Sequence, residues 1–173
     1  MTAPVLVTGG TGTIGSRVVP LLRAAGRNVR ILSRHPRPDE SGIEHVEGDT
    51  VAGDGLQPAL KGVNTVLHLA GGPKGDDIAA RNLADAARSA GIGHLILISV
   101  VGADRMPIRY FRAKAAAERA IAESGVPWTA WAQAVVAFDL GVRWGRMPRR
   151  AQDVDQGRPG RDFPRVGRGS VVR

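Results

Sequence analysis

Cysteine is absent from the sequence, which excludes disulfide bonds, iron–sulfur clusters and thiolate zinc sites within this chain. No apolar run approaches the ~18–20 residues that a membrane-spanning helix needs. The N-terminus has no basic segment followed by a long apolar stretch, so we expect no signal peptide and a cytoplasmic location. The four histidines lack the paired spacing typical of metal ligands, so we predict no metal site.

Acidic residues are few relative to basic ones, and the formal net charge is +8 over 173 residues. Such a surplus, taken alone, suggests an anionic partner such as nucleic acid. However, residues 1–142 carry 15 basic and 13 acidic groups, whereas residues 143–173 carry nine arginines and three aspartates. Because the body of the chain is nearly neutral, nucleic-acid binding would depend on the arginine-rich tail alone, and it is the weakest of three alternative functions that the sequence leaves open.

Short apolar runs alternate with helical patterns through most of the chain, which predicts an α/β fold with a parallel sheet. We expect strands at residues 5–7, 29–32, 43–47, 63–70, 94–101 and 128–136, and helices at residues 14–25, 76–90 and 107–124. Residues 1–140 would form the folded domain. Residues 141–173 are rich in Arg, Gly and Pro without sustained periodicity, so we predict an irregular tail.

A glycine-rich turn connects the first predicted strand to the first predicted helix, and residues 8–15 read TGGTGTIG. A Gly-x-Gly-x-x-Gly pattern in this context is typical of dinucleotide binding, because glycines let backbone N–H groups approach a pyrophosphate at a helix N-terminus. A plain glycine-rich turn is the alternative. The predicted cofactor contacts in this turn are Gly9, Gly10, Thr11, Gly12, Thr13, Ile14 and Gly15.

The end of the second predicted strand bears on the choice between NAD and NADP. An acidic residue there would bind the ribose 2′-hydroxyl and repel a 2′-phosphate, but the sequence has Ser33 and Arg34 and no acid before Asp39. Arg34 can form a bidentate contact with a phosphate, and Ser33 can add a hydrogen bond. We therefore predict NADP over NAD, with a solvated surface arginine as the alternative.

Two further segments follow predicted strands. Asp49 comes after the third, where its carboxylate could accept from an adenine amino group or could form an Asx turn. Small residues after the fourth strand, Ala70, Gly71 and Gly72, would let the backbone run against the cofactor.

Tyr110 and Lys114 are spaced i and i+4 in a predicted helix, so their side chains share one face. An adjacent ammonium stabilises a phenolate and lowers the pKa of the tyrosine, which would make Tyr110 a general acid for carbonyl reduction. Lys114 could also hold the nicotinamide ribose, and Ser99, near the end of the fifth predicted strand, could hydrogen-bond the reacting oxygen. The alternative is an exposed tyrosine and lysine on a basic helix face.

Other polar and aromatic residues are assigned to the scaffold. We expect His68 and His94 to be structural, Trp128 and Trp131 to lie in the core, and Asn82 to be a surface residue.

Several motifs, taken in order, resemble the atypical short-chain dehydrogenase/reductase group that includes the NmrA-like NAD(P)-binding proteins. The resemblance covers residues 4 to about 129 and is carried by residues 8–15, 33–34 (SR), 48–49 (GD), 82–87 (NLADAA), 98–102 (ISVVG), 110–118 (YFRAKAAAE) and 124–129 (SGVPWT). It implies a Rossmann-type, doubly wound parallel sheet in three layers. The cofactor would lie across residues 9–15, Arg34, Asp49 and residues 70–72.

The group contains reductases of quinones, flavin-like compounds and activated double bonds, and also NADP-binding redox sensors that regulate transcription partners. Its lysine at the Lys114 position serves cofactor binding, whereas its tyrosine at the Tyr110 position is a less dependable catalyst. Similar members run ~100 residues longer, in line with a small substrate-binding region added to the Rossmann domain. Because residues 130–134 read AWAQA where branched apolar residues and an arginine are usual, we hypothesise a shortened or altered C-terminal part.

The sequence therefore predicts an NADP(H)-binding oxidoreductase that transfers hydride to a small carbonyl, quinone or conjugated substrate. The alternative is a catalytically silent NADP(H) sensor that acts through a protein partner. We predict no membrane association, and the sequence does not indicate the oligomeric state.

Overall fold

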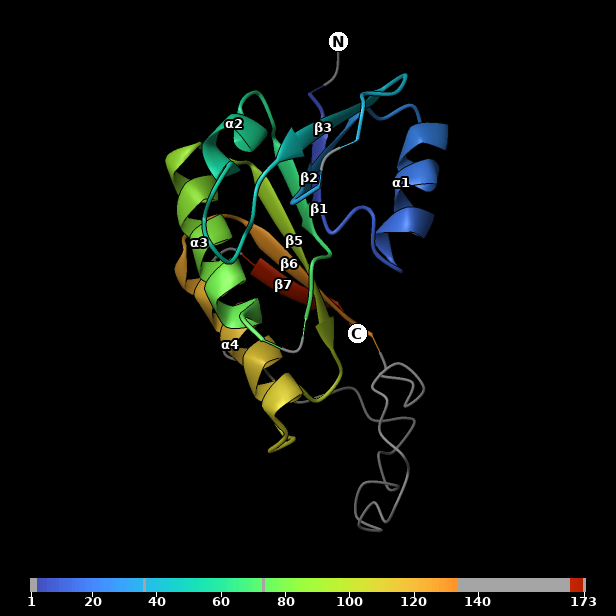
Figure 1. Cartoon of the computed structure of the whole chain (residues 1–173). Helices are drawn as coiled ribbons and strands as arrows, with labels where there is room; N and C mark the ends of the chain where they lie inside the picture. The colour runs from blue at the N-terminus through green and yellow to red at the C-terminus, as the bar shows by residue number, and fades with distance from the viewer. Residues whose placement is uncertain (1–2, 36, 73, 134–168, 173) are drawn as a thin grey trace.

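A seven-stranded, all-parallel sheet forms the centre of the molecule (Figure 1), in the order β3-β2-β1-β4-β5-β6-β7. The computed structural model describes residues 3–35, 37–72, 74–133 and 169–172. The strands are β1 (Val5–Thr8), β2 (Val29–Ser33), β3 (Ile43–Glu47), β4 (Thr65–His68), β5 (His94–Val100), β6 (Trp128–Gln133) and β7 (Gly169–Val172). The helices are α1 (Gly15–Ala24), α2 (Leu56–Leu60), α3 (Asp76–Ser89) and α4 (Arg109–Glu123).

The helices cover both faces of the sheet, with α1 on one face and α2, α3 and α4 on the other (Figure 1). The chain moves outward from β1 to β2 and β3, and then returns to place β4 on the other side of β1. Right-handed crossovers that run in opposite directions put their helices on opposite faces. The predicted three-layer, doubly wound α/β fold is therefore confirmed, and its topological switch point lies between β1 and β4.

The two faces have separate apolar cores. Leu6 of β1, Leu83 of α3 and Leu95 of β5 belong to the larger core, beneath α2, α3 and α4, and all three are fully buried. A smaller core beneath α1 includes Val7 and Val19. Burial of each such side chain contributes about 1.5–3 kcal/mol, so both cores hold the strand ends in fixed positions.

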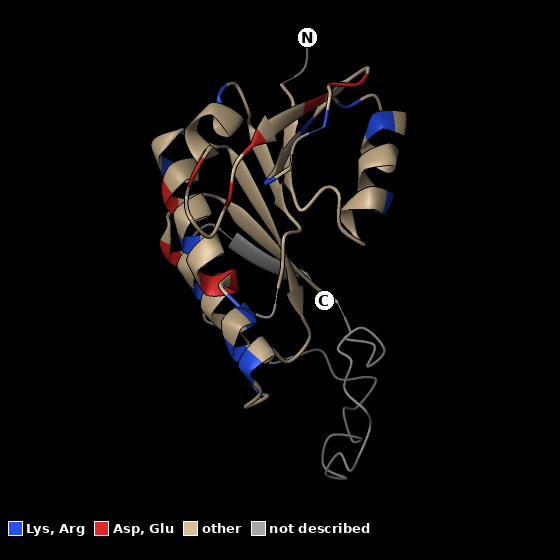
Figure 2. Ribbon diagram, in the orientation of Figure 1, with Lys and Arg blue, Asp and Glu red and all other residues tan. Residues whose placement is uncertain are grey.

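The central strands carry almost no charge. No Lys, Arg, Asp or Glu occurs in β1, β4, β5 or β6, as expected for strands covered on both faces. Charged residues lie mainly on the helices and connections (Figure 2). Among the described residues, no helix has the length and apolar character that crossing a bilayer would require.

The structure departs from the predictions in three places. Helix α2 was not expected, because five residues that include Pro58 are too few to show a helical period. Gly169–Val172 lie in the tail predicted to be irregular, yet they pair with β6 as β7, whose two valines favour a strand. Trp128 is buried as predicted, but Trp131 is 54% exposed rather than in the core. Residues 134–136 of the predicted sixth strand and residues 141–168 of the tail lie outside the described residues.

Candidate functional site

The glycine-rich loop between β1 and α1 is packed too tightly to accept side chains at its two ends. Gly9 has a φ of 70°, and a Cβ atom there would lie 2.6 Å from the backbone nitrogen of Ala70. A Cβ on Gly15 would lie 2.2 Å from the carbonyl oxygen of Gly9. Both approaches are shorter than van der Waals contact, so the loop fits only glycine at these positions. The loop is thereby pressed against the end of β4 on one side and the start of α1 on the other.

Several backbone donors of this loop have no hydrogen-bond acceptor among the residues that the structure describes. The Gly12 N–H donates to the Gly9 carbonyl, but the N–H groups of Thr11, Thr13 and Ile14 have no acceptor within the described part of the chain. The first turn of α1 contains no acidic residue. Unpaired N–H groups and the positive end of a helix dipole attract anions. The loop therefore fits the pyrophosphate of a dinucleotide.

The residues predicted to recognise a 2′-phosphate lie at the carboxyl end of β2. The Ser33 hydroxyl both donates to the His35 carbonyl and accepts from the His35 N–H, each at 3.2 Å. The Arg34 guanidinium is exposed and has no hydrogen bond or ion pair to any described residue. Arg34 is therefore available to a ligand, whereas Ser33 is already engaged locally.

Asp49 forms the Asx turn that was the structural alternative to an adenine contact. Its Oδ1 accepts from the Val51 N–H at 2.7 Å and from the Ala52 N–H at 3.4 Å. The Nδ2 group of Asn82, on α3, donates to the carbonyls of Thr50 and Val51 at 3.0 and 2.9 Å. Asn82 is half-buried and fixes this turn, contrary to the expected surface role.

The segment after β4 contacts two charged side chains that are themselves paired. The Asp76 Oδ1 accepts from the Gly72 N–H at 2.7 Å, and its Oδ2 lies 2.9 Å from the Lys114 Nζ. A Cβ on Gly71 would lie 3.2 Å from the same Nζ. The Asp76 and Lys114 side chains are only 6% and 5% exposed, so this ion pair is buried at the end of β4.

Tyr110 and Lys114 share one face of α4, as their spacing predicted. The Lys114 Nζ lies 5.9 Å from the centre of the Tyr110 ring. Tyr110 is half-buried and packs edge-on against Phe111, with 5.7 Å between the ring centres.

Ser99 points into the protein interior. Its side chain is fully buried, and its hydroxyl donates to the carboxylate of Glu118, one turn beyond Lys114 on α4. This contact favours a structural role for Ser99 over the predicted contact with a reacting oxygen.

His68, at the end of β4, is buried beneath the glycine loop. Its Nδ1 and the hydroxyl of Thr8, at the end of β1, are 2.6 Å apart. Complete burial is the main cause that lowers the pKa of His68 from 6.5 to about 4; the Lys114 charge also lowers it, and Asp76 partly opposes the shift. His68 is therefore neutral at physiological pH, in keeping with its predicted structural role.

The carboxyl ends of the parallel strands bring most predicted positions to one edge of the sheet. The glycine loop and residues 70–72 contact each other directly, and residues 70–72 in turn contact Lys114. Sequence reasoning did not find Asp76 or Glu118. Asp76 lies in the first turn of α3, where an acidic residue is common. That position alone gave no sign of the contact with Lys114.

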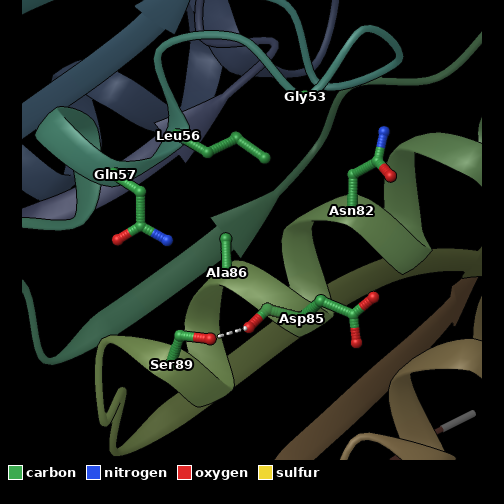
Figure 3. A pocket seen from close by; sticks show the side chains of 7 residues that line it. All are labelled: Gly53, Leu56, Gln57, Asn82, Asp85, Ala86 and Ser89. Carbon is green, nitrogen blue, oxygen red and sulfur yellow. Dashed lines mark hydrogen bonds between the residues drawn. The ribbon is translucent and has the colours of Figure 1, made fainter.

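A shallow pocket of about 290 Å³ lies away from the glycine loop, between α2, the turn that precedes it and α3 (Figure 3). Asn82, which fixes the neighbouring turn, is one of the residues that line the pocket. The full lining is Gly53, Leu56, Gln57, Asn82, Asp85, Ala86 and Ser89. The pocket includes none of the predicted site residues.

A protein-family model described as NAD(P)H-binding matches residues 9–136. A (4-alkanoyl-5-oxo-2,5-dihydrofuran-3-yl)methyl phosphate reductase of Streptomyces griseus is 36% identical over 130 residues, which cover 72% of this chain and 45% of that protein. An NAD(P)H azoreductase of Xenophilus azovorans is 32% identical over 130 residues, with coverages of 72% and 46%. The chain thus spans about half the length of these two relatives.

Solved structures with the same fold contain nicotinamide dinucleotides. The triphenylmethane reductase of Citrobacter sp., complexed with NADP(H), superposes with a TM-score of 0.68 at 26% identity over 78% of this chain and 50% of that one. MoeE5, in complex with UDP-glucuronic acid and NAD, gives a TM-score of 0.66 at 28% identity, with coverages of 75% and 54%. The similar structures therefore include both NAD and NADP(H) complexes.

Proposed function

Since this chain belongs to the NAD(P)H-binding family of the atypical short-chain dehydrogenase/reductase kind, we propose that it binds NADP(H) and takes part in hydride transfer to a small carbonyl, quinone or conjugated acceptor. The observation that carries this proposal is the glycine loop, which is packed against Ala70 and presents the N–H groups of Thr11, Thr13 and Ile14, none of which has an acceptor among the described residues. Those donors would bind the pyrophosphate.

The preference for NADP rests on Arg34. Its exposed guanidinium follows β2 directly, and no carboxylate lies between it and Asp39 to bind a free 2′-hydroxyl. A guanidinium matches the geometry of a phosphate and forms two parallel hydrogen bonds with it. Arg34 would therefore favour a 2′-phosphate over a 2′-hydroxyl.

When bound, the nicotinamide ring supplies the hydride. The Lys114 ammonium, beside Gly71 at the end of β4, would hold the adjoining ribose. The half-buried Tyr110, one turn earlier on α4, would donate the proton that the reduced acceptor needs. The substrate would be a small molecule that enters next to Tyr110.

A catalytically silent NADP(H) sensor, acting through a protein partner, is the second candidate function. The observation that favours it is that Ser99, a predicted catalytic group, already donates to Glu118, and that Lys114 is already paired with Asp76. A sensor needs the cofactor site but no proton donor.

Titration of the full chain with NADPH and NADH tests the cofactor proposal. Loss of the Arg34–phosphate contact in Arg34→Ala should weaken NADPH binding about 10–100-fold, because a hydrogen bond to a charged group contributes about 1.5–3 kcal/mol. NADH binding should not change. Arg37→Ala, an exposed arginine three positions further along, is the matched control. Failure of both nucleotides to bind the wild type would contradict the proposal.

Turnover separates the two functions. NADPH oxidation with a panel of quinones and conjugated carbonyls, lost in Tyr110→Phe with NADPH binding retained, would support the enzyme. Nucleotide binding without turnover on any acceptor would support the sensor.

A further inference from the structure

We propose that Asp76 is a positioning residue for the cofactor site, because its carboxylate fixes both the Lys114 ammonium and the backbone at Gly72. The inference rests on the proposed function, since it assumes that Lys114 and residues 70–72 face the nicotinamide half of a dinucleotide.

A single carboxylate joins three elements of the fold. Asp76 lies in the first turn of α3, Lys114 in the middle of α4, and Gly72 in the segment that follows β4. Oδ2 lies 2.9 Å from the Lys114 Nζ, and Oδ1 accepts the Gly72 N–H at 2.7 Å. Each carboxylate oxygen thus contacts a different group. The position of the Lys114 ammonium and the conformation of residues 70–72 therefore depend on the same side chain.

These contacts lie beside the glycine loop. Ala70 is the residue against which Gly9 packs, and Gly71, the next residue, lies against the Lys114 ammonium. In an open α/β sheet a ligand lies outside the carboxyl ends of the strands at the switch point, here between β1 and β4. A dinucleotide whose pyrophosphate is on the glycine loop would therefore pass residues 70–72 and reach Lys114.

The ion pair leaves Lys114 able to bind a ligand. An ammonium has three N–H donors, and its 2.9 Å contact with Asp76 Oδ2 is an ion pair in which Oδ2 accepts no hydrogen bond from the described residues. Burial removes both side chains from water, so the carboxylate restricts the ammonium to one position at this site. Lys114 would then meet ribose hydroxyls with little further loss of side-chain freedom.

Stabilisation of α3 alone does not explain the placement of Asp76. Asp77, the next residue, also lies in the first turn of α3 and also complements the helix dipole, yet it is less buried and does not contact Lys114. The pair Asp76→Asn and Asp77→Asn therefore separates the two effects, because each substitution removes one carboxylate from the same turn.

The experiment compares binding of two ligands to the full-length chain. NADPH would contact both halves of the site, whereas 2′,5′-ADP would occupy only the half formed by the glycine loop and Arg34. We expect Asp76→Asn to weaken NADPH binding at least tenfold and to change 2′,5′-ADP binding less than twofold. Asp77→Asn should change neither. A Lys114→Gln substitution combined with Asp76→Asn should weaken NADPH binding no more than Lys114→Gln alone.

Three results would overturn the inference. Unchanged NADPH binding by Asp76→Asn would show that the carboxylate does not position the site, and equal losses for NADPH and 2′,5′-ADP would show a structural role alone. Failure of the wild type to bind either ligand would contradict the proposed function, and the inference with it. If Asp76→Asn does not fold, Asp76→Glu decides the question: a lowered ratio of NADPH to 2′,5′-ADP affinity supports positioning, and an unchanged ratio contradicts it.

Discussion

The Thr8 hydroxyl and the His68 ring are hydrogen-bonded across neighbouring strands, with 2.6 Å between Oγ1 and Nδ1. Thr8 is followed directly by the glycine loop, and His68 precedes Ala70 by two residues. The pair therefore joins β1 to β4 immediately beneath the contact between Gly9 and Ala70. Because burial is the main cause that lowers the pKa of His68 to about 4, the ring in this pair is neutral at physiological pH.

Acid should weaken the fold through His68. In the unfolded chain the ring takes up a proton near its ordinary pKa of 6.5, whereas the folded protein resists this until about pH 4. The free energy of unfolding should therefore be highest above pH 6.5 and fall as the pH drops from 6.5 to 4. The loss from this group is about 2 kcal/mol at pH 5 and about 3 kcal/mol at pH 4. Urea unfolding across this range measures it.

The His68→Gln variant separates this contribution from that of other groups. It lacks the imidazole, so its stability should decline less steeply between pH 6.5 and 4 than that of the wild type. Parallel pH profiles for the two proteins would show that His68 does not cause the decline.

Gly15→Ala should damage the glycine loop. The added methyl group would lie 2.2 Å from the Gly9 carbonyl oxygen and 2.5 Å from the Gly10 Cα, and overpacking of this kind costs about 1–3 kcal/mol. Displacement of the loop should also weaken NADPH binding more than tenfold. Gly26→Ala, beyond the other end of α1, is the control. Its φ of 73° makes the substitution cost about 1–2 kcal/mol, but no atom of the described residues lies within 4 Å of the new methyl group, so binding should not change.

Ser99→Ala should lower stability rather than act first on chemistry. The substitution removes the donor to the Glu118 carboxylate, a type of hydrogen bond that contributes about 1.5–3 kcal/mol. In a thermodynamic cycle with Glu118→Gln, the double variant should lose less stability than the two single variants predict when added. Normal stability with lost turnover in Ser99→Ala would instead support the contact with substrate that the sequence predicted.

Asn82→Ala should loosen the turn after β3. Two donor contacts to the Thr50 and Val51 carbonyls disappear, and the expected loss of stability is about 1–3 kcal/mol. Asp85→Ala, on an exposed position one turn along α3, should change stability by less than about 0.5 kcal/mol. Similar losses in the two variants would show that Asn82 does not fix the turn.

The predicted features that the structure confirms are those that depend on local sequence patterns. The alternation of strands and helices appears as local apolar runs, and most predicted elements agree with the structure to within a few residues. The glycine pattern is local as well, because Gly9 and Gly15 belong to one turn. Helix α2 was missed since it is too short for any periodicity to be visible.

The contacts around Lys114 could not be predicted from the sequence, because they join elements that are distant along the chain. Asp76 and Lys114 lie on different helices, and the packing of α3 against α4 brings them together. Neither residue belongs to a sequence motif that also includes the other. The same reason hid the contact between Ser99 and Glu118, which joins β5 to α4.

The insertion of β1 between β2 and β4 has a consequence for folding. Thr8 and His68 are sixty residues apart in the sequence, so the glycine loop cannot take its place against Ala70 until this long stretch of chain has been closed. Closure of long loops is entropically costly and slows folding. Folding intermediates in which only β1 and β2 have paired would lack the packed glycine loop, and so could not bind the nucleotide. The recovery of nucleotide binding during refolding should therefore report the arrival of β4 beside β1.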